Sequence, residues 1–393
     1  MRPQEAKNQA PTTIRRWQSC NASAREAVRE FREGVWQPDS ALVLFFCSVE
    51  YDLDAVAQEM ERQFAGIQVV GCTTAGEIGP AGYRDHSIGG ASFPAGSFTA
   101  VSELIPRLHE FERSAGQAFA QVQMGKLESR APQAAVGNTF MLMLIDGLSE
   151  REEVVTRALQ SALGDIPVVG GSAGDGLNFA RTHVYFGGRF HTDAAVAVLA
   201  STPRPFTIFK IQHFVPTDKR LVVTEADPAR RTVRELNGLP AVEEYARVIG
   251  ADPLNLQPTR FASSPVVVLL DGGNYVRSIQ KACSDGSLKF FCAIEEGLVL
   301  RVARGVDLVA NMAEAFEQIR SDIGSPELVL GCDCILRKLE IFQNGLTREA
   351  HDILEQNNTI GFSTYGEQFR GVHVNQTLTG VAIGRGAPAA GNV

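Results

Sequence analysis

The sequence has little that would attach it to nucleic acid or to a membrane. Its 393 residues include 37 lysines and arginines against 45 aspartates and glutamates, which gives a formal net charge of −8. Nucleic-acid binding and electrostatic membrane binding both need a basic surface, so we expect neither as the main interaction. No apolar stretch approaches the ~20 residues that span a bilayer, so we also expect no membrane insertion.

Signals for secretion, disulfide formation and nucleotide binding are also lacking. The first residues are polar, with Pro3 and Pro11 and no apolar segment, so we expect no signal peptide. Seven cysteines, an odd number, are scattered through a long chain, which is typical of reduced thiols in a cytoplasmic protein. There is no Walker A sequence and no convincing dinucleotide fingerprint.

What the sequence does have is one loop pattern that occurs three times. "VVGCTTAGE" covers 69–77, "VVGGSAGD" covers 168–175 and "TIGFSTYGE" covers 359–367. Each copy has an apolar lead-in, a glycine, a run of small or hydroxyl residues, a second glycine and an acid, which is Glu77, Asp175 or Glu367. Repetition of this kind indicates related structural units.

Each loop also ends a strand–helix–strand pattern. Apolar runs at 41–46, 140–145 and 327–330 have the composition of strands. Helix signals follow them, namely a cap at Asp52, a capping box of Ser149 and Glu152, and a start at Thr347. We therefore predict three βαβ units, each followed by a further strand. A histidine precedes each further strand (His86, His191 and His373), and we interpret these three as one shared position.

The expected fold is α/β, with repeated βαβ units, mixed sheets and a β-rich segment. Residues 206–302 hold short strand-like runs, interrupted by a helical stretch at 232–250. We predict a flexible N-terminus, an N-terminal domain with two repeat units, a C-terminal domain with the β-rich segment and the third unit, and a tail. Their boundaries are 1–24, 25–224, 225–385 and 386–393.

One motif points to catalysis. "GGSAG" at 170–174 matches the G-x-S-x-G elbow of α/β hydrolases, and a strand precedes it as the elbow requires. The following "DGLNFARTH" is a poor helix start, and the other two loops are not elbows. A glycine turn with Ser172 bonded to the backbone is the favoured interpretation. A serine hydrolase using Ser172 stays an alternative.

The third loop has the most polar residues around it. Loops beyond strand ends bind ligands in open α/β sheets, so its acid either caps local amides or faces a ligand. If the nearby groups converge, they suit a small zwitterion or a haem propionate. We predict a binding site there and structural roles for the other two loops, with an internal ion pair of Arg337 and Glu367 as the alternative. The candidate residues are Arg337, Ser363, Thr364, Glu367, His373, Asn375 and Thr377.

Metal binding has weaker support. Cys332 and Cys334 form a C-x-C pair without a partner pair at zinc-like spacing, which favours buried small side chains. His183, His191 and His213 have aromatic or aliphatic neighbours, as a haem ligand needs. A histidine in a strand is more often a satisfied core or rim residue.

Together, these stretches resemble the FIST sensory proteins, which pair an N-terminal with a C-terminal FIST domain. The matching stretches are "VVGCTTAGEI" and "VVGGSAGD" in the first domain, and "CDCILRK", "IGFSTYGEQ" and "HVNQT" in the second. The resemblance covers roughly residues 25–385. It implies sensing in bacterial signalling, with small ligands such as amino acids.

One branch of the family is similar in having only the two FIST domains. The resemblance to it implies a sensor that binds haem b, responds to nitric oxide and controls a partner histidine kinase, and so biofilm behaviour. We take His183 as the first candidate ligand to the haem iron, followed by His191 and His213. A sensor of a small organic ligand such as an amino acid, without haem, is the alternative. No catalytic activity is expected in either case.

Overall fold

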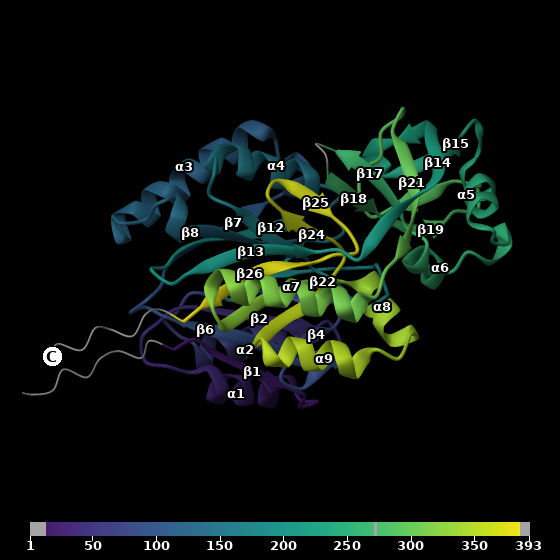
Figure 1. Cartoon of the computed structure of the whole chain (residues 1–393). Helices are drawn as coiled ribbons and strands as arrows, with labels where there is room; N and C mark the ends of the chain where they lie inside the picture. The colour runs from purple at the N-terminus through teal and green to yellow at the C-terminus, as the bar shows by residue number, and fades with distance from the viewer. Residues whose placement is uncertain (1–12, 271–272, 386–393) are drawn as a thin grey trace, which may run out of the picture.

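Three repeats of one chain path build most of the protein (Figure 1). The computed structural model describes residues 13–270 and 273–385. In each repeat, an outer strand and a helix lead into a strand–helix–strand unit with two parallel strands. A short hairpin follows, and an antiparallel strand ends the repeat. The α/β fold predicted from the sequence, with its repeated βαβ units, is confirmed.

The elements of the repeats occupy matching places. Repeat 1 consists of β1 (Arg15–Ser19), α1 (Ala24–Val35), β2 (Ser40–Ser48), α2 (Leu53–Gln63), β3 (Val69–Thr74), β4 (Glu77–Gly79), β5 (Gly82–Arg84) and β6 (Ile88–Pro94). Repeat 2 consists of β7 (Thr99–Pro106), α3 (Arg113–Arg130), β8 (Thr139–Ile145), α4 (Glu152–Leu163), β9 (Val168–Ser172), β10 (Val184–Phe186), β11 (Arg189–His191) and β12 (Ala194–Ser201). Repeat 3 consists of β13 (Phe206–Ile211), α7 (Leu308–Ile323), β22 (Pro326–Cys334), α8 (Ile335–Gln343), α9 (Thr347–Gln356), β23 (Thr359–Thr364), β24 (Glu367–Phe369), β25 (Val372–Val374) and β26 (Leu378–Gly384).

A β-rich module is inserted into repeat 3, between β13 and α7. In Figure 1 it lies to one side of the repeats, in green. The module has its own apolar core, which includes Tyr245, Phe261 and Phe290. It consists of β14 (Phe214–Asp227), β15 (Thr232–Leu236), β16 (Leu239–Pro240), α5 (Ala241–Ile249), α6 (Pro258–Ser263), β17 (Val266–Leu270), β18 (Gly273–Arg277), β19 (Ile279–Ala282), β20 (Leu288–Phe290) and β21 (Val299–Gly305).

Two of the predicted domain boundaries can be compared with the described elements. The boundary between 224 and 225 falls inside β14, which runs without a break to Asp227. Residues 15–19, assigned to a flexible N-terminus of 1–24, form β1 and pair with β6. Residues 1–12 and the predicted tail, 386–393, lie outside the described residues.

The repeats exchange their hairpins around a closed ring. The β4–β5 hairpin of repeat 1 pairs with β23 of repeat 3, and the β24–β25 hairpin of repeat 3 pairs with β9 of repeat 2. The β10–β11 hairpin of repeat 2 pairs with β3 of repeat 1 and completes the ring. Each repeat therefore builds a six-stranded sheet, and the strand order is the same in all three sheets. From one edge to the other, the order is the outer strand, the last strand, the first and second parallel strands, and the two strands of the borrowed hairpin.

Strand register identifies equivalent residues in the three repeats. Thr73, Ser172 and Ser363 lie opposite the same position of the neighbouring parallel strand. Just beyond them, the backbone amides of Ala75, Gly174 and Tyr365 donate to the carbonyls of Ser363, Thr73 and Ser172, at 2.9, 3.0 and 3.4 Å. These three bonds connect each repeat to the next, so the three loops meet at the centre of the ring.

The equivalence that the sequence predicted for the three acids fails at Asp175. Glu77 and Glu367 take equivalent positions in their hairpins, and the residue there in repeat 2 is Val184. Val184 lies twelve residues after Ser172, whereas Glu367 lies four after Ser363. Repeat 2 therefore carries eight additional residues, 175–182, which we call the extra loop.

The interpretation of three histidines as one shared position is also wrong. His373 lies opposite Gln368 in its hairpin, and the equivalent residues are Tyr83 and Phe190. His191 lies opposite Val184, where Arg84 and Val374 are the counterparts. The histidines are not equivalent because the number of residues between the histidine and the following strand differs from repeat to repeat.

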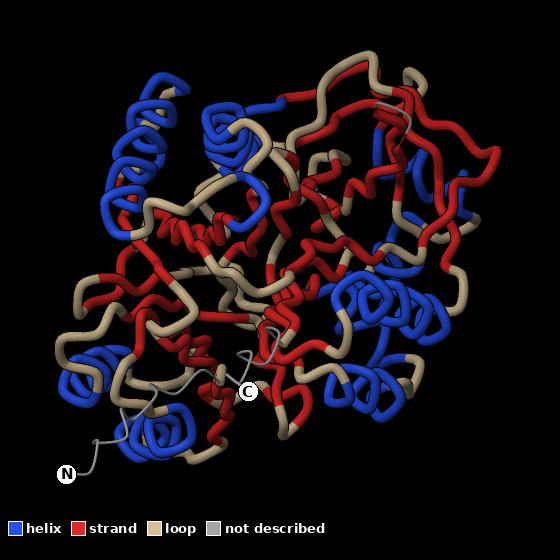
Figure 2. The backbone as a smooth tube through the Cα atoms, turned by 60° about the vertical axis from the view of Figure 1, so that its left-hand side comes forward, coloured by secondary structure: helices blue, strands red, loops and turns tan. Residues whose placement is uncertain are grey.

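The main core lies between the three sheets, and the helices lie outside them (Figure 2). Strands of all three repeats contribute to it, and Phe46 of repeat 1 stacks on Phe362 of repeat 3 with ring centroids 4.6 Å apart. Separate apolar clusters join each sheet to its own helices. No helix among the described residues is long and apolar enough to cross a membrane.

Candidate functional site

Two cavities open near the carboxyl ends of parallel strands, where open α/β sheets bind ligands. Cavity A has a volume of about 400 Å³ and lies between the loop after β8, the extra loop and the inserted module. Cavity B has a volume of about 380 Å³ and lies between repeat 1, the extra loop and α8. Asn178 lines both, so the extra loop separates them. A larger groove of about 720 Å³ lies at the opposite, amino ends of β2 and β3.

Cavity A combines aromatic rings with cations. Phe179 of the extra loop lies 5.8 Å from Phe291 of the inserted module, measured between ring centroids. Lys289 pairs with Glu150 and donates to the carbonyl of Arg230 at 2.6 Å. The residues that line cavity A from the repeat 2 side are Gly147, Leu148, Glu150, Asn178 and Phe179, and from the module Arg231, Pro258, Gln280, Lys281, Lys289, Phe290 and Phe291.

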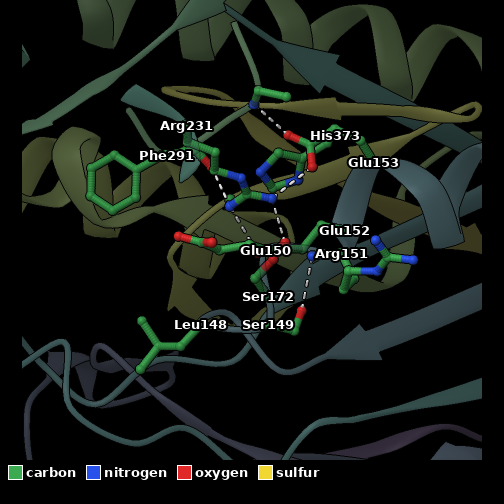
Figure 3. Close-up of polar contacts among 12 residues, drawn as sticks. Leu148, Ser149, Glu150, Arg151, Glu152, Glu153, Ser172, Arg231, Phe291 and His373 are labelled. Atoms are coloured by element: carbon green, nitrogen blue, oxygen red, sulfur yellow. Dashed lines mark hydrogen bonds and ion pairs between the residues drawn. The ribbon is translucent and has the colours of Figure 1, made fainter. Parts of the chain in front are cut away.

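Arg231 fixes the inserted module to the start of α4 (Figure 3). Its guanidinium lies 2.5 Å from a carboxylate oxygen of Glu152 and 2.6 Å from one of Glu153, and it also donates to the carbonyl of Phe291 at 2.8 Å. Burial alone lowers the pKa of Arg231, but the two carboxylates outweigh it and raise that pKa above its usual value. The pKa of Glu153 is held at about 2, because His373 and Arg231 outweigh the effect of burial. Glu153 and Arg231 are therefore charged at neutral pH, whereas burial lowers the pKa of His373.

A buried polar group lies behind Arg231, with His373 beside the guanidinium in Figure 3. Gln368 donates to the Ser172 hydroxyl at 2.9 Å and lies 3.3 Å from Nδ1 of His373. Arg277 of the inserted module donates to the His373 carbonyl at 3.1 Å. Among the described residues, Nε2 of His373, Nδ2 of Asn375 and Oε1 of Gln368 are buried without a partner. Buried polar atoms usually have a hydrogen-bond partner, which is a protein group or an ordered water.

Ser172 does not have the geometry of a nucleophile elbow. It is the last residue of β9, it is fully buried, and its hydroxyl accepts from Gln368. The extra loop follows it in place of a helix. An elbow exposes its serine on a sharp strand-to-helix turn, so the sequence match carries no support from this structure.

The structure brings together part of the predicted third-loop site. Oε2 of Glu367 accepts from the backbone amide and the hydroxyl of Thr377, at 3.1 and 2.7 Å, and Thr364 lies 3.4 Å from Oε1. All three residues are fully buried. Burial raises the pKa of Glu367 well above its usual value. The carboxyl group is therefore an internal acid bonded to hydroxyls, and it does not face either cavity.

The other candidates of that site lie apart from Glu367. Arg337 donates to Asp333 at 2.8 Å and contacts Nδ1 of His213 at 2.9 Å, so its ion pair is with Asp333 and not with Glu367. His373 and Asn375 pack against Gly366, below the inserted module. Ser363 is buried, and its hydroxyl has no partner among the described residues.

Repeat 1 has the same buried acid arrangement, and repeat 2 has lost it. Glu77 accepts from the hydroxyls of Thr74 and Ser87, at 2.5 and 2.7 Å, and burial raises its pKa to about 8. We call the sets Thr74–Glu77–Ser87 and Thr364–Glu367–Thr377 the acid triads. The equivalent residues of repeat 2 are all apolar and all buried, namely Ala173, Val184 and Ala194.

The three candidate haem ligands have different surroundings. Both ring nitrogens of His213 have partners, Arg337 on one side and Glu340 at 3.0 Å on the other. Nε2 of His191 lies 3.0 Å from the carbonyl of Phe186. Nδ1 of His183 is buried without a partner among the described residues. None of the three lines cavity A, cavity B or the larger groove.

Other metal binding also lacks a site in the described chain. No group of three or more His, Cys, Asp or Glu side chains there could hold a metal ion. Cys332 and Cys334 are buried, and burial raises the pKa of both thiols. They pack as small apolar side chains, as the C-x-C pair on a strand indicated.

Sequence reasoning missed cavity A. Its cations, Arg231, Lys281 and Lys289, lie in the inserted module, which has no counterpart in the repeats and no motif. The signal that could have found it is the length of the extra loop, because a long insertion in a repeated turn often carries function.

Comparison with protein families now identifies the chain. The FIST N domain model matches residues 41–239, and the FIST C domain model matches residues 241–370. The chain belongs to the FIST family. FIST domains are sensory domains of signal-transduction proteins. The junction between the two matches falls within the inserted module, between β16 and α5, so cavity A lies between residues of the FIST N and FIST C matches.

Similarity to individual proteins adds little to the family. A search of the curated proteins finds no match. A solved structure of cyanuric acid hydrolase is similar at 10% sequence identity and a TM-score of 0.31, covering 75% of this chain and 99% of that chain. A TM-score this low supports no conclusion about fold or activity.

Proposed function

We propose that this FIST protein senses a small organic ligand with a carboxylate, bound in cavity A. The observation that carries the proposal is the cavity itself, in which phenyl rings and lysine ammonium groups line one space between the two FIST domains. Its volume of about 400 Å³ lies within the ~300–1,000 Å³ typical of ligand sites, and its mixture of apolar walls and few charges is also typical.

An amino acid fits the charges of cavity A. Lys281 offers a cation for a carboxylate, and the ion pair of Lys289 and Glu150 beside it can exchange partners with the two charges of an amino acid. Phe179 and Phe291 provide apolar surface for a side chain. Arg231 is already held by Glu152 and Glu153, so its main role is to position the module beside the ligand.

The ligand site joins two parts of the protein, which are repeat 2 and the inserted module. Glu150 and Asn178 belong to repeat 2, whereas Lys281 and Phe291 belong to the inserted module. A ligand that contacts both sides stabilises their present arrangement, and allosteric coupling of this kind is typically worth about 1–3 kcal/mol. We propose that a partner protein binds this arrangement and responds to it. The family resemblance implies that the partner is a histidine kinase.

Calorimetric titration with single L-amino acids, and with the amine and carboxylic acid analogues of each, tests the proposal. We expect binding of at least one carboxylate-bearing compound, weakened about tenfold in Lys281→Met, because a charge-assisted hydrogen bond is worth ~1.5–3 kcal/mol. Lys219→Met is the matched control, since Lys219 is exposed on the module and does not line cavity A. Equal losses in both variants, or no binding across the panel, would overturn the proposal.

A haem-based nitric oxide sensor is the second candidate, and the unpartnered Nδ1 of His183 is the observation in its favour. Purified protein reconstituted with haem should then show a stoichiometric Soret band that shifts with nitric oxide and is lost in His183→Ala. His351→Ala is the control, since His351 lies on α9 away from the candidate ligands. An unchanged spectrum in His183→Ala removes that residue, and weak non-stoichiometric binding removes the haem.

Regulation of a kinase and absence of catalysis are tested separately. Autophosphorylation of the partner kinase should differ between ligand-free and ligand-bound protein, and equal rates despite binding exclude regulation in that pair. We also propose that the protein binds without catalysis, because Ser172 is buried and bonded to Gln368. Stoichiometric labelling by a serine-reactive phosphonate that disappears in Ser172→Ala contradicts this.

A further inference from the structure

Cavity B has a different chemistry from cavity A, although the two share the extra loop. We propose that cavity B is a second binding site, for a small primary amine with an apolar chain. The proposal rests on the lining of cavity B alone and does not depend on what binds in cavity A.

All three repeats contribute to cavity B. The loops after β2 and β3, at 48–50 and 74–76, supply the repeat 1 side, and residues 175–178 of the extra loop supply the repeat 2 side. Helix α8 of repeat 3 supplies the remaining wall. The site thus lies at the carboxyl ends of β2 and β3, which is the end of a parallel strand pair that binds ligands in α/β sheets.

The walls carry apolar side chains that are unusually exposed. Leu177 is 54% exposed and Phe342 is 45% exposed, and both line cavity B. Ile335 and Leu339 of α8 line it as well. Large apolar side chains that face a concave space are typical of a ligand site, because an apolar ligand group removes them from water.

The charges of cavity B favour a cation. Glu50 and Asp85 have carboxylates that are largely exposed, at 64% and 73% of the side chain, and both line the cavity. His86 lies 3.2 Å from Glu50. Asp175 is buried deeper, and its carboxylate already accepts from the amides of residues 179, 180 and 181 and from the Tyr365 hydroxyl. The exposed rim is therefore anionic, opposite in sign to the lysines of cavity A.

Lys338 is the cation in cavity B, and its ammonium lies 5.7 Å from the centroid of the Phe342 ring. Its ammonium donates to the carbonyl of Ala75 at 2.8 Å and pairs with Asp85, and the side chain is only 8% exposed. Gly76 makes this approach possible, because a Cβ at that position would lie 2.3 Å from the Lys338 nitrogen, and its φ of 125° also favours glycine. Lys338 is held by Asp85 and the carbonyl of Ala75, so Glu50 is the carboxylate left to meet an incoming ammonium group, beside the His86 ring at 3.2 Å.

Titration with phenethylamine and with its charge-reversed analogue 3-phenylpropionate tests the proposal. Phenethylamine should bind more tightly than 3-phenylpropionate. Glu50→Gln should weaken it about threefold to fivefold, the size of an exposed ion pair. Phe342→Ala should weaken it about tenfold through lost apolar contact. Both side chains are largely exposed, so both variants should fold.

Matched controls separate this site from cavity A. Glu33→Gln removes an exposed carboxylate outside both cavities, and Lys281→Met changes cavity A only. Both should leave phenethylamine binding unchanged. If 3-phenylpropionate binds as tightly as phenethylamine, or if Glu50→Gln and Phe342→Ala have no effect, cavity B is not an amine site. Loss of binding in Lys281→Met also overturns the proposal, since it places the amine in cavity A.

Discussion

Repeats 1 and 3 each bury a carboxyl group, and repeat 2 fills the same space with hydrocarbon. The acid triads place Glu77 and Glu367 among hydroxyl and amide donors, whereas Ala173, Val184 and Ala194 of repeat 2 pack into the main core. The backbone path and strand register are the same in all three. In each repeat, the three residues are therefore either all polar or all apolar. A buried polar set in which some groups lack hydrogen-bond partners destabilises the fold more than an apolar set does.

The second difference between the repeats lies in the turn that follows. Repeats 1 and 3 close it with Gly76 and Gly366, and repeat 2 opens it into the extra loop before His183. Asp175 holds this loop by accepting from three consecutive amides. The extra loop then forms a wall of both cavities. The ring of repeats is therefore a scaffold, and the one irregular turn shapes its candidate binding sites.

The largest expected effect comes from placing an acid triad residue in repeat 2. Val184→Glu puts a carboxylate between Ala173 and Ala194, neither of which can donate from its side chain. We expect a loss of about 3–5 kcal/mol in the free energy of unfolding at pH 8, the cost of an uncompensated buried charge. Chemical denaturation measures it. The control is the triple variant Ala173→Thr, Val184→Glu, Ala194→Ser, which should recover part of the loss, and no recovery contradicts the equivalence.

The pH dependence of stability should follow from Glu77. Its pKa is about 8 in the folded protein and near 4.5 when unfolded, so only the folded state keeps the proton between these values. Its contribution is complete below pH 4.5 and decreases as pH rises toward 8, by about 1.4 kcal/mol per pH unit. Glu77→Gln lacks this decrease, so its stability relative to the parent should increase from pH 5 to pH 8. Glu128→Gln, at an exposed position, is the matched control, and a difference for Glu77→Gln that stays constant with pH contradicts the shift.

A smaller effect should come from breaking a triad in part. Glu77→Val leaves the hydroxyls of Thr74 and Ser87 buried without their acceptor, which costs about 1–3 kcal/mol. The triple variant Thr74→Ala, Glu77→Val, Ser87→Ala copies repeat 2 and should be more stable than the single variant. Thermal denaturation at one fixed pH compares the two. If the triple variant is the less stable of the two, the sets do not act as units.

The smallest effect concerns the contact between the extra loop and the third loop. Phe179 stacks on Tyr365 with ring centroids 4.7 Å apart, and Tyr365 is equivalent to Ala75 and Gly174. Single and double variants Phe179→Leu and Tyr365→Leu should give a coupling energy of about 0.5–1.5 kcal/mol in a double-mutant cycle. Coupling indistinguishable from zero means that the rings do not stabilise the extra loop.

The sequence predicted the repeats because their signals are local. Glycines in each turn, apolar runs and helix caps lie within about thirty residues of one another, and each favours the same element. The hairpin exchange has no local signal, because β4 and β23 pair across most of the chain. The alignment of Asp175 with the two glutamates failed for a related reason. The extra loop begins with an acidic residue, so the sequence alone does not reveal that Asp175 belongs to an insertion.

The candidate site was predicted only in part. Thr364, Glu367 and Thr377 belong to the seven residues predicted to surround the third loop, and these three are in contact in the structure. Arg337 was misplaced because α8 begins directly after β22, and Asp333 and Arg337 then lie four residues apart at its start. Cavity A depends on how the inserted module packs against repeat 2, and no pattern within either segment encodes that packing.

The exchange of hairpins also sets the order in which the chain can mature on the ribosome. When repeat 1 has been synthesised, its β4–β5 hairpin has no strand to pair with until β23 emerges, and β3 waits for β10. Pairings between distant segments close late and fold slowly. A nascent chain therefore carries the open edges of β4 and β9 until β23 and β24 of repeat 3 emerge.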